Sequence, residues 1–255
     1  MTEKLFYTDS HQQEFTAEVV SCRPCDNGYE AVLSRTAFFP EGGGQAADTG
    51  LIDGIRVYDV QEKGDQIFHY LEGALEEGKT VTGQIDWDKR FSRMQQHSGE
   101  HIVSGIVHAR FGYDNVGFHL NDELCTLDLS GPLTKEELRE VEDAANEAVF
   151  ANVPVQVSYP SKEELKTLDY RSKIEIDGQV RIVTIPGYDV CACCAPHVNF
   201  TGEIGLIKVL GMINYKGGVR ISMLCGRKAM LDYERKQKTT TAISVLLSAK
   251  PDRLT

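Results

Sequence analysis

Short apolar runs separated by turn residues fill the first third of the chain. The runs occupy residues 18–20, 30–33, 51–52, 55–57, 66–70 and 80–82. Asn27-Gly28, Asp53-Gly54 and Lys63-Gly64 stand between them, and such pairs are typical of tight turns that join antiparallel strands. The pattern predicts a small antiparallel β-barrel or sandwich over residues 1–87, and of the two we expect the barrel.

A helical spacing of apolar residues begins at Asp88. Asp88 is a suitable N-cap for this helix, and Gly112 is a suitable residue to end it. A second helix is predicted from the capping box of Thr134 and Glu137 to about Ala151. The apolar positions that fit the first helix are Phe91, Met94, Ile102, Val103, Ile106 and Val107.

Strand patterns return between Val155 and Met223, most clearly at 181–185 and 205–210. A last helix is predicted over 227–250 and is ended by Pro251. The fold class is therefore α+β, in three parts. We expect an N-terminal small β-barrel over 1–87, an α+β domain over 88–232 and a C-terminal helix over 233–255.

The charge balance limits the partners of the chain. Its 255 residues include 27 Lys and Arg against 38 Asp and Glu, a net charge of -11. This balance excludes a broad non-specific nucleic-acid surface, so we expect no DNA partner, but it leaves local basic clusters at 89–93, 171–173 and 216–228. Because no apolar stretch approaches about 18 residues, we expect no membrane partner and a cytoplasmic protein.

Two pairs of metal-binding residue types stand out. His97 and His101 are four residues apart in the first predicted helix, so both imidazoles project from one face. Cys193 and His197 repeat this spacing and supply the sulfur and nitrogen ligands that zinc prefers. The two pairs together predict one shared metal ion. Cys191 and Cys194 compete with Cys193 for the thiolate role.

Further segments are distinctive in content and order. They are residues 36–45 (TAFFPEGGGQ), 48–50 (DTG), 95–101 (QQHSGEH), 116–119 (VGFH), 172–174 (SKI), 201–205 (TGEIG) and 217–221 (GGVRI). With the Cys193–His197 pair, they make the chain similar to the editing domain of alanyl-tRNA synthetase and to its free-standing relatives, the AlaX trans-editing proteins. The resemblance runs from Leu5 to about Ala229.

The resemblance implies an activity and a set of site residues. It implies an α+β editing domain with one zinc ion per chain, and hydrolysis in trans of the aminoacyl ester of alanine tRNA wrongly charged with serine or glycine. The partner implied is the acceptor end of that tRNA. The implied zinc ligands are His97, His101, Cys193 and His197, and the implied substrate contacts are Gly42, Gly43, Gly44, Gln45, Gly117, Phe118 and His119.

Two features qualify what the resemblance implies. The family commonly has Gly-Thr before its last histidine, whereas this chain has Ala195-Pro196, which changes how the amino acid is held. In longer members the C-terminal helix continues toward a coiled coil. We therefore expect residues 233–255 to be the start of such a coiled coil, to offer a surface for oligomer formation, and the chain to edit rather than to charge tRNA.

Two other interpretations of the same residues stay open. His97-Ser98-Gly99-Glu100-His101 also matches the H-x-x-E-H motif of inverted zinc metallopeptidases, although that enzyme class does not explain Cys193 and His197. Alternatively, the chain is a tRNA-binding module in which zinc only stabilises the fold.

The number of zinc ligands affects the mechanism. Four protein ligands close the tetrahedron, in which case zinc organises the pocket and Glu100 is the candidate catalytic base. Ester hydrolysis benefits from an open metal position, which favours His197 as the loose ligand.

Overall fold

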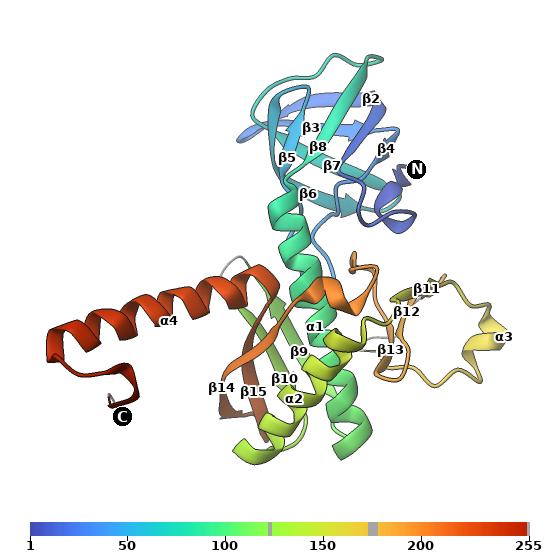
Figure 1. Cartoon of the computed structure of the whole chain (residues 1–255). Helices are drawn as coiled ribbons and strands as arrows, with labels where there is room; N and C mark the ends of the chain where they lie inside the picture. Colours follow the sequence, from blue (N-terminus) through green and yellow to red (C-terminus); the bar gives the residue numbers. More distant parts are fainter. Residues whose placement is uncertain (122–123, 173–177, 254–255) are drawn as a thin grey trace.

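The computed structural model describes residues 1–121, 124–172 and 178–253. A barrel lies at one end of the molecule, and a mixed layer of helices and sheets lies at the other (Figure 1). The long helix α1 (Trp87–Phe111) leads from the barrel into the second part, and α4 (Gly226–Leu247) projects away from the body. The predicted mixed α+β class is confirmed.

Six strands close into a barrel in the order β2-β3-β7-β6-β5-β8. Each of the six apolar runs of the sequence lies in one of these strands. Side chains alternate along them, so that in β2 Phe15, Ala17 and Val19 are buried and their neighbours face outward. The strands are β2 (Glu14–Cys25), β3 (Gly28–Leu33), β5 (Gly50–Ile52), β6 (Ile55–Lys63), β7 (Gln66–Leu71) and β8 (Thr80–Ile85), and beside them lie β1 (Glu3–Lys4), η1 (Leu5–Tyr7) and β4 (Arg35–Thr36).

The second part contains a four-stranded sheet in the order β14-β15-β10-β9 and a three-stranded sheet in the order β11-β12-β13. Helices α1 and α2 share the larger apolar core with the four-stranded sheet. The remaining elements are β9 (Asn115–Leu120), β10 (Cys125–Leu129), α2 (Lys135–Ala151), β11 (Gln156–Ser158), α3 (Lys162–Leu165), β12 (Ile182–Ile185), β13 (Asp189–Ala192), η2 (Thr201–Ile204), β14 (Ile207–Tyr215), β15 (Gly218–Cys225) and η3 (Pro251–Arg253).

The helix ends agree with the predicted signals except at the start of α1 and at the end of α4, which ends at Leu247 rather than at residue 250 because Ser248 takes a left-handed conformation. Thr134 and Glu137 form the predicted capping box, and Gly112 ends α1 in a left-handed conformation with φ of 70°. The prediction of Asp88 as N-cap is wrong, because the N-cap is Asp86 and Asp88 lies in the first turn. Asp86 continues the barrel pairing through its backbone N–H, which donates to the carbonyl of Thr49 at 2.8 Å.

Residues 36–48, here called the glycine strap, leave the barrel and lie along α1. Arg90 is fully buried and donates to Asp48 Oδ2 at 2.8 Å through Nε and to the carbonyl of Ala37 at 2.5 Å through Nη2. One turn later, Arg93 Nη1 donates to the carbonyl of Ala47 at 2.5 Å. The first turns of α1 therefore fix the strap that connects the two parts of the fold.

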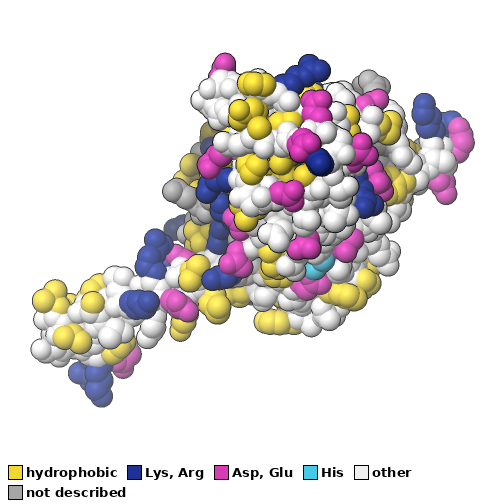
Figure 2. Space-filling model, turned by 90° about the horizontal axis from the view of Figure 1, so that it is seen from above, with side chains coloured by type: hydrophobic (Ala, Val, Ile, Leu, Met, Phe, Trp, Pro, Cys, Tyr) yellow, Lys and Arg dark blue, Asp and Glu magenta, His cyan; other side chains and the backbone are white. Residues whose placement is uncertain are grey.

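The outer surface mixes acidic, basic and apolar side chains, as Figure 2 shows for the face seen from the barrel end. Apolar side chains are prominent near the end of α4, where Val245 is 75% exposed and Leu246 is 82% exposed. The expected boundary between residues 232 and 233 falls within α4, and the expected oligomer surface there stays a prediction. In the described ranges, no helix has both the length and the apolar content needed to cross a bilayer.

Candidate metal centre

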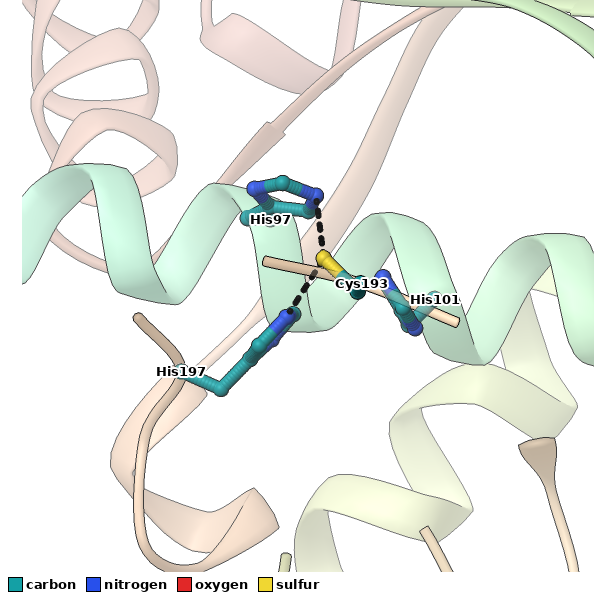
Figure 3. A group of neighbouring side chains, drawn as sticks. All are labelled: His97, His101, Cys193 and His197. Carbon is teal, nitrogen blue, oxygen red and sulfur yellow. Dashed lines mark hydrogen bonds between the residues drawn. The ribbon is translucent and has the colours of Figure 1, made fainter. Parts of the chain in front are cut away.

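Four side chains meet where α1 passes the loop that follows β13. His97 and His101 come from α1, and Cys193 and His197 come from the loop (Figure 3). Their ligand atoms all lie within 4.8 Å of one another. Cys193 Sγ is 3.4 Å from His197 Nε2 and 3.7 Å from His97 Nε2. The four residues that the sequence indicates as zinc ligands are therefore neighbours in space.

Each of the three imidazoles is oriented by a second side chain at its Nδ1 atom. The partners are Gln45 Oε1 at 3.0 Å from His97, Asp189 Oδ2 at 2.8 Å from His101 and Ser98 Oγ at 3.0 Å from His197. An imidazole whose Nδ1–H donates to an oxygen keeps its Nε2 lone pair for a metal. The hydrogen bonds thus fix both the orientation and the tautomer that metal binding needs.

The His197 ring is held as firmly as the other two rings. Ser98 Oγ, its Nδ1 partner, also accepts from the backbone N–H of Val198 at 3.3 Å. Ser10 Oγ, from the barrel end of the chain, donates to the carbonyl of His197 at 2.8 Å. The ring is 3% exposed. These contacts support four ligands of equal standing rather than a loose His197.

The donor set fits zinc in chemistry and in spacing. Three imidazole nitrogens and one thiolate are ligands that zinc prefers. In a tetrahedral site with Zn–N near ~2.05 Å and Zn–S near ~2.3 Å, a nitrogen and a sulfur are separated by about 3.6 Å. The Sγ–Nε2 distances of 3.4 and 3.7 Å lie on either side of that value. An ion of this size can therefore occupy the cluster without a large rearrangement.

The ionisation states of Cys193 and His197 suit metal binding. Burial opposes ionisation of the Cys193 thiol, but the facing imidazoles of His97 and His197 outweigh it and hold the thiol pKa well below its usual range. Burial lowers the pKa of His197 to about 3, so this ring is neutral at pH 7. Thiolate and neutral imidazole are the forms that bind a metal, so these two ligands are already in the required state. Burial opposes protonation of His101, but Cys191, the carboxylate of Asp189 and Cys193 outweigh it and hold the pKa of this ring well above its usual range, so metal binding has to displace a proton from His101.

A cavity of about 660 Å³ opens beside the cluster. Its walls include Gly43, Gly44, His97, Glu100 and Phe118, all of them predicted site residues, together with His101 and Cys193. The Phe118 ring centroid is 4.7 Å from that of His97, so the phenyl ring covers one side of the metal cluster. A substrate in this cavity would meet both the glycine strap and the cluster.

Only glycine fits the tip of the strap. Gly43 and Gly44 have φ of 60° and 82°, the left-handed conformation that side chains disfavour. A Cβ atom on Gly44 would lie 2.8 Å from both the ring and the carbonyl oxygen of Phe118. The carbonyl of Gly44 also accepts from the backbone N–H of Leu120 at 3.0 Å. The strap is therefore attached to β9, where it forms one wall of the cavity.

Glu100 lies next to the cluster and is held in place. The carboxylate is 1% exposed, and its Oε1 accepts from Ser104 Oγ at 2.5 Å and from Asn115 Nδ2. Glu100 lines the cavity together with the ligands. A carboxylate at this place is able to take up a proton from a water molecule that enters the cavity.

Other predicted substrate residues lie away from the cavity wall. Gln45 is 1% exposed and contacts His97, while Gly42 pairs with Gln45 through two backbone hydrogen bonds that close the strap. Gly117 and His119 alternate with Phe118 along β9, and a Cβ on Gly117 would meet Asp128 instead. A role for these four residues in substrate binding stays a prediction. Lys173 and Ile174, in a segment that carried the resemblance, lie outside the described residues.

The two competing cysteines take different places. Cys191 lies near His101 and Asp189 in a second buried group, and Cys194 lies beside Gly43. Both line the cavity, but Cys193 is the thiol that faces the histidine pair of α1 and His197 together.

Sequence reasoning missed the residues that support the ligands. Asp189 accepts from Arg171 Nε at 2.7 Å and from Arg171 Nη2 at 3.0 Å, besides its contact with His101. Ser98 lies inside the His97–His101 motif, and this position is a signal that could have found it, since a hydroxyl near a ligand is a common partner. For Asp189 the only signal is its position at the end of an apolar run.

Two known families match parts of the chain. Residues 180–222 match the family described as "Threonyl and Alanyl tRNA synthetase second additional domain". Residues 3–89 match the family described as "tRNA synthetases class II (A)". The first range contains Cys193 and His197, whereas His97 and His101 lie between the two matched ranges.

Individual proteins match almost the whole chain. It is 33% identical to an alanine–tRNA ligase of Ignicoccus hospitalis, over 99% of this chain and 29% of that protein. It is 33% identical to the alanyl-tRNA editing protein Aarsd1 of Rattus norvegicus, over 94% of this chain and 62% of that protein. It is also 33% identical to the alanyl-tRNA editing protein AlaX-L of Pyrococcus horikoshii, over 90% of this chain and 59% of that protein. The chain thus spans about three fifths of the length of these two editing proteins.

Proposed function

The chain belongs to the family of alanyl-tRNA editing proteins, and from this premise we propose that it hydrolyses the aminoacyl ester of mischarged alanine tRNA in trans. The acyl groups proposed are serine and glycine, and the partner is the acceptor end of the tRNA. The reaction adds water across the ester and yields a free amino acid and a free terminal ribose hydroxyl. The proposal includes one zinc ion per chain and a cytoplasmic site of action.

The observation that carries the proposal is the cluster of His97, His101, Cys193 and His197, of which all but His197 line a cavity of about 660 Å³. Relatives that match 90% and 94% of this chain at 33% identity are named alanyl-tRNA editing proteins. A zinc ion held by all four side chains would organise this wall of the cavity and leave proton transfer to a side chain beside it. The cavity is wide enough for an aminoacyl group and the terminal nucleoside.

The residues around the cluster have separate tasks in the proposed reaction. Glu100 takes up the proton of the attacking water at its carboxylate, which Ser104 and Asn115 hold in position. Phe118 and the glycine strap limit the space next to the cluster, which restricts the acyl group to small side chains. Gln45, Asp189 and Ser98 orient the three imidazoles.

The arrangement of Glu100 also bears on the metallopeptidase alternative. In that class a glutamate within H-x-x-E-H activates water on an open metal. Here the positions around the histidine pair are taken by Cys193 and by a well-anchored His197. This favours the editing proposal over the peptidase.

Release of labelled amino acid from charged alanine tRNA tests the proposal. We expect release from Ser- and Gly-charged tRNA, little release from Ala-charged tRNA and no cleavage of casein. Cys193→Ala provides the inactive control, and Cys22→Ala, on the barrel, provides the active one. The proposed function would be refuted if each of the three charged tRNAs released its amino acid at the same rate with and without the protein.

Two further measurements separate editing from tRNA binding by a module with structural zinc. Elemental analysis should find about one zinc per chain. Binding of tRNA should weaken with salt, with a slope in log K against log salt of about -2 to -4, because only a few phosphates meet basic residues on this acidic protein. Tight zinc and salt-dependent binding without any deacylation would support the module instead.

A further inference from the structure

Cationic side chains that line the cavity differ in how their charge is balanced. Among the described lining residues they are Lys4, Arg171 and Arg181. Lys4 Nζ donates to Glu62 Oε1 at 2.6 Å, and Arg171 forms two hydrogen bonds with Asp189. Arg181 forms no ion pair with a carboxylate in the described part of the chain, although it is only 8% exposed. Its charge is thus the one left without a counter-ion.

The hydrogen bonds of Arg181 use only one side of the guanidinium group. Nη1 donates to the carbonyl of Cys193 at 2.8 Å and to the carbonyl of Ala195 at 3.0 Å. Nε is buried and has no partner among the described atoms. The guanidinium carbon lies 5.3 Å from the ring centroid of Tyr7, so the aromatic ring fixes the plane of the group. Since Nε is shielded, Nη2, for which the described residues provide no hydrogen-bond partner, is the donor that remains for a ligand.

A buried cation without a counter-ion is unfavourable, and an anion that enters the cavity would balance it. A guanidinium N–H forms a charge-assisted hydrogen bond with an oxygen of a phosphate or carboxylate. Arg181 is one hydrogen bond away from the backbone of the ligand Cys193. The anion would therefore lie next to the metal centre.

We propose that Arg181 binds the phosphate of the 3′-terminal nucleotide of the RNA substrate. The inference rests on the proposed function and names a contact within it. The carboxyl group of the amino acid is esterified and carries no charge, so it cannot be the anion. The terminal phosphate is attached to the same ribose that carries the ester, which makes it the nearest negative charge. Arg181 is thus a positioning residue that places the ester at the cluster.

A pair of substrates that differ in phosphate tests the contact. One is a Ser-charged RNA minihelix, and the other is the seryl ester of adenosine, which has no phosphate. Arg181→Met should lower kcat/KM for the minihelix by about 10- to 100-fold, chiefly through KM, because a charge-assisted hydrogen bond is lost. With the adenosine ester, the variant should stay within about twofold of the wild type. Arg181→Lys, which keeps the charge, should recover part of the loss.

Two controls accompany these variants. Arg56→Met removes an exposed arginine that pairs with Glu72 on the barrel, and it should leave both substrates unaffected. Elemental analysis shows whether Arg181→Met still holds its metal. Equal losses on the two esters would overturn the proposal, because they would show that Arg181 only supports the carbonyls of Cys193 and Ala195.

Binding of uncharged minihelix separates this inference from the proposed function. Fluorescence anisotropy should show that Arg181→Met binds the minihelix more weakly than the wild type does. The slope of log K against log salt should be smaller in magnitude by about 1 for the variant. If the wild type hydrolyses neither ester, the proposed function is wrong, but the phosphate contact is still judged by this binding difference. Identical affinities and salt slopes for wild type and variant would overturn the contact.

Discussion

Acidification should destabilise the barrel through one buried histidine. His69 on β7 is 0% exposed, and burial lowers its pKa from 6.5 to about 4. Its Nδ1 lies 3.2 Å from the carbonyl of Ala31, which only accepts, so Nδ1 carries the proton. Nε2 then accepts from Thr36 Oγ1 at 2.8 Å. Both ring nitrogens are satisfied in the neutral ring, which leaves no favourable place for a second proton.

The size of the effect follows from the two pKa values. Between pH 6.5 and pH 4 the unfolded chain binds a proton that the folded chain excludes, so the free energy of unfolding falls as the pH falls. The stabilisation is complete above pH 6.5 and is lost on the way to pH 4. Between pH 7.5 and pH 5, the loss is about 2 kcal/mol.

Urea unfolding followed by far-UV circular dichroism at several pH values measures this loss. His69→Gln should be less stable than the wild type at pH 7.5, because Gln packs less well, but the difference should shrink by about 2 kcal/mol at pH 5. Protonation of the metal ligands affects both proteins equally and cancels in the comparison. His108→Gln, at an exposed histidine of α1, is the matched control and should follow the wild type. Parallel stability curves for wild type and His69→Gln would refute the reasoning.

Four more predictions concern the metal centre and the strap. Cys193→Ala should lose the metal while Cys22→Ala keeps it, as measured by elemental analysis, and a metal-replete Cys193→Ala would remove Cys193 from the site. Asp189→Asn should weaken metal affinity about 10- to 100-fold in competition with a chelator, since it removes the charged partner of His101; unchanged affinity would contradict that role. Glu100→Gln should keep the metal but lower deacylation about 10²-fold or more, and retention of most activity would exclude it as the base. Gly44→Ala should destabilise the fold more than Gly54→Ala: both glycines have φ near 80°, but a Cβ at Gly44 would meet Phe118, whereas a Cβ at Gly54 meets nothing within 4 Å. Equal urea midpoints of the two variants would show that the contact with Phe118 is unimportant.

The elements that the sequence predicts well are those with local causes. The six strands of the barrel follow from alternation and from turn residues within a few positions of each run. The end of α1 at Gly112 and the start of α2 at Thr134 likewise depend on neighbours in the chain. The start of α1 cannot be placed from local signals, because the pairing of Asp86 with Thr49 is a tertiary contact.

The same distinction applies to the candidate site. Both ligand pairs have the local spacing of four residues, so each is visible in the sequence. The residues that orient the ligand rings are not visible in the same way, because Gln45 is 52 residues from His97 and Asp189 is 88 residues from His101. The resemblance implies that Gln45 contacts substrate, yet its side-chain oxygen is occupied by a ligand ring. Only the packing of the strap on α1 explains that contact.

The strap explains why a metal centre in the α+β part depends on the barrel. Arg90, Arg93 and His97 follow one another along one face of α1, and each contacts the strap or its residue Gln45. The Arg90–Asp48 pair is fully buried, and removing one partner of such a pair costs about 3–5 kcal/mol because the other charge is left unpaired. The barrel therefore holds Gln45 at a fixed position beside α1, and Gln45 in turn orients the ring of His97. A barrel and a helix that moved independently would lose the orientation of this ligand and the cavity wall formed by Gly43 and Gly44 together.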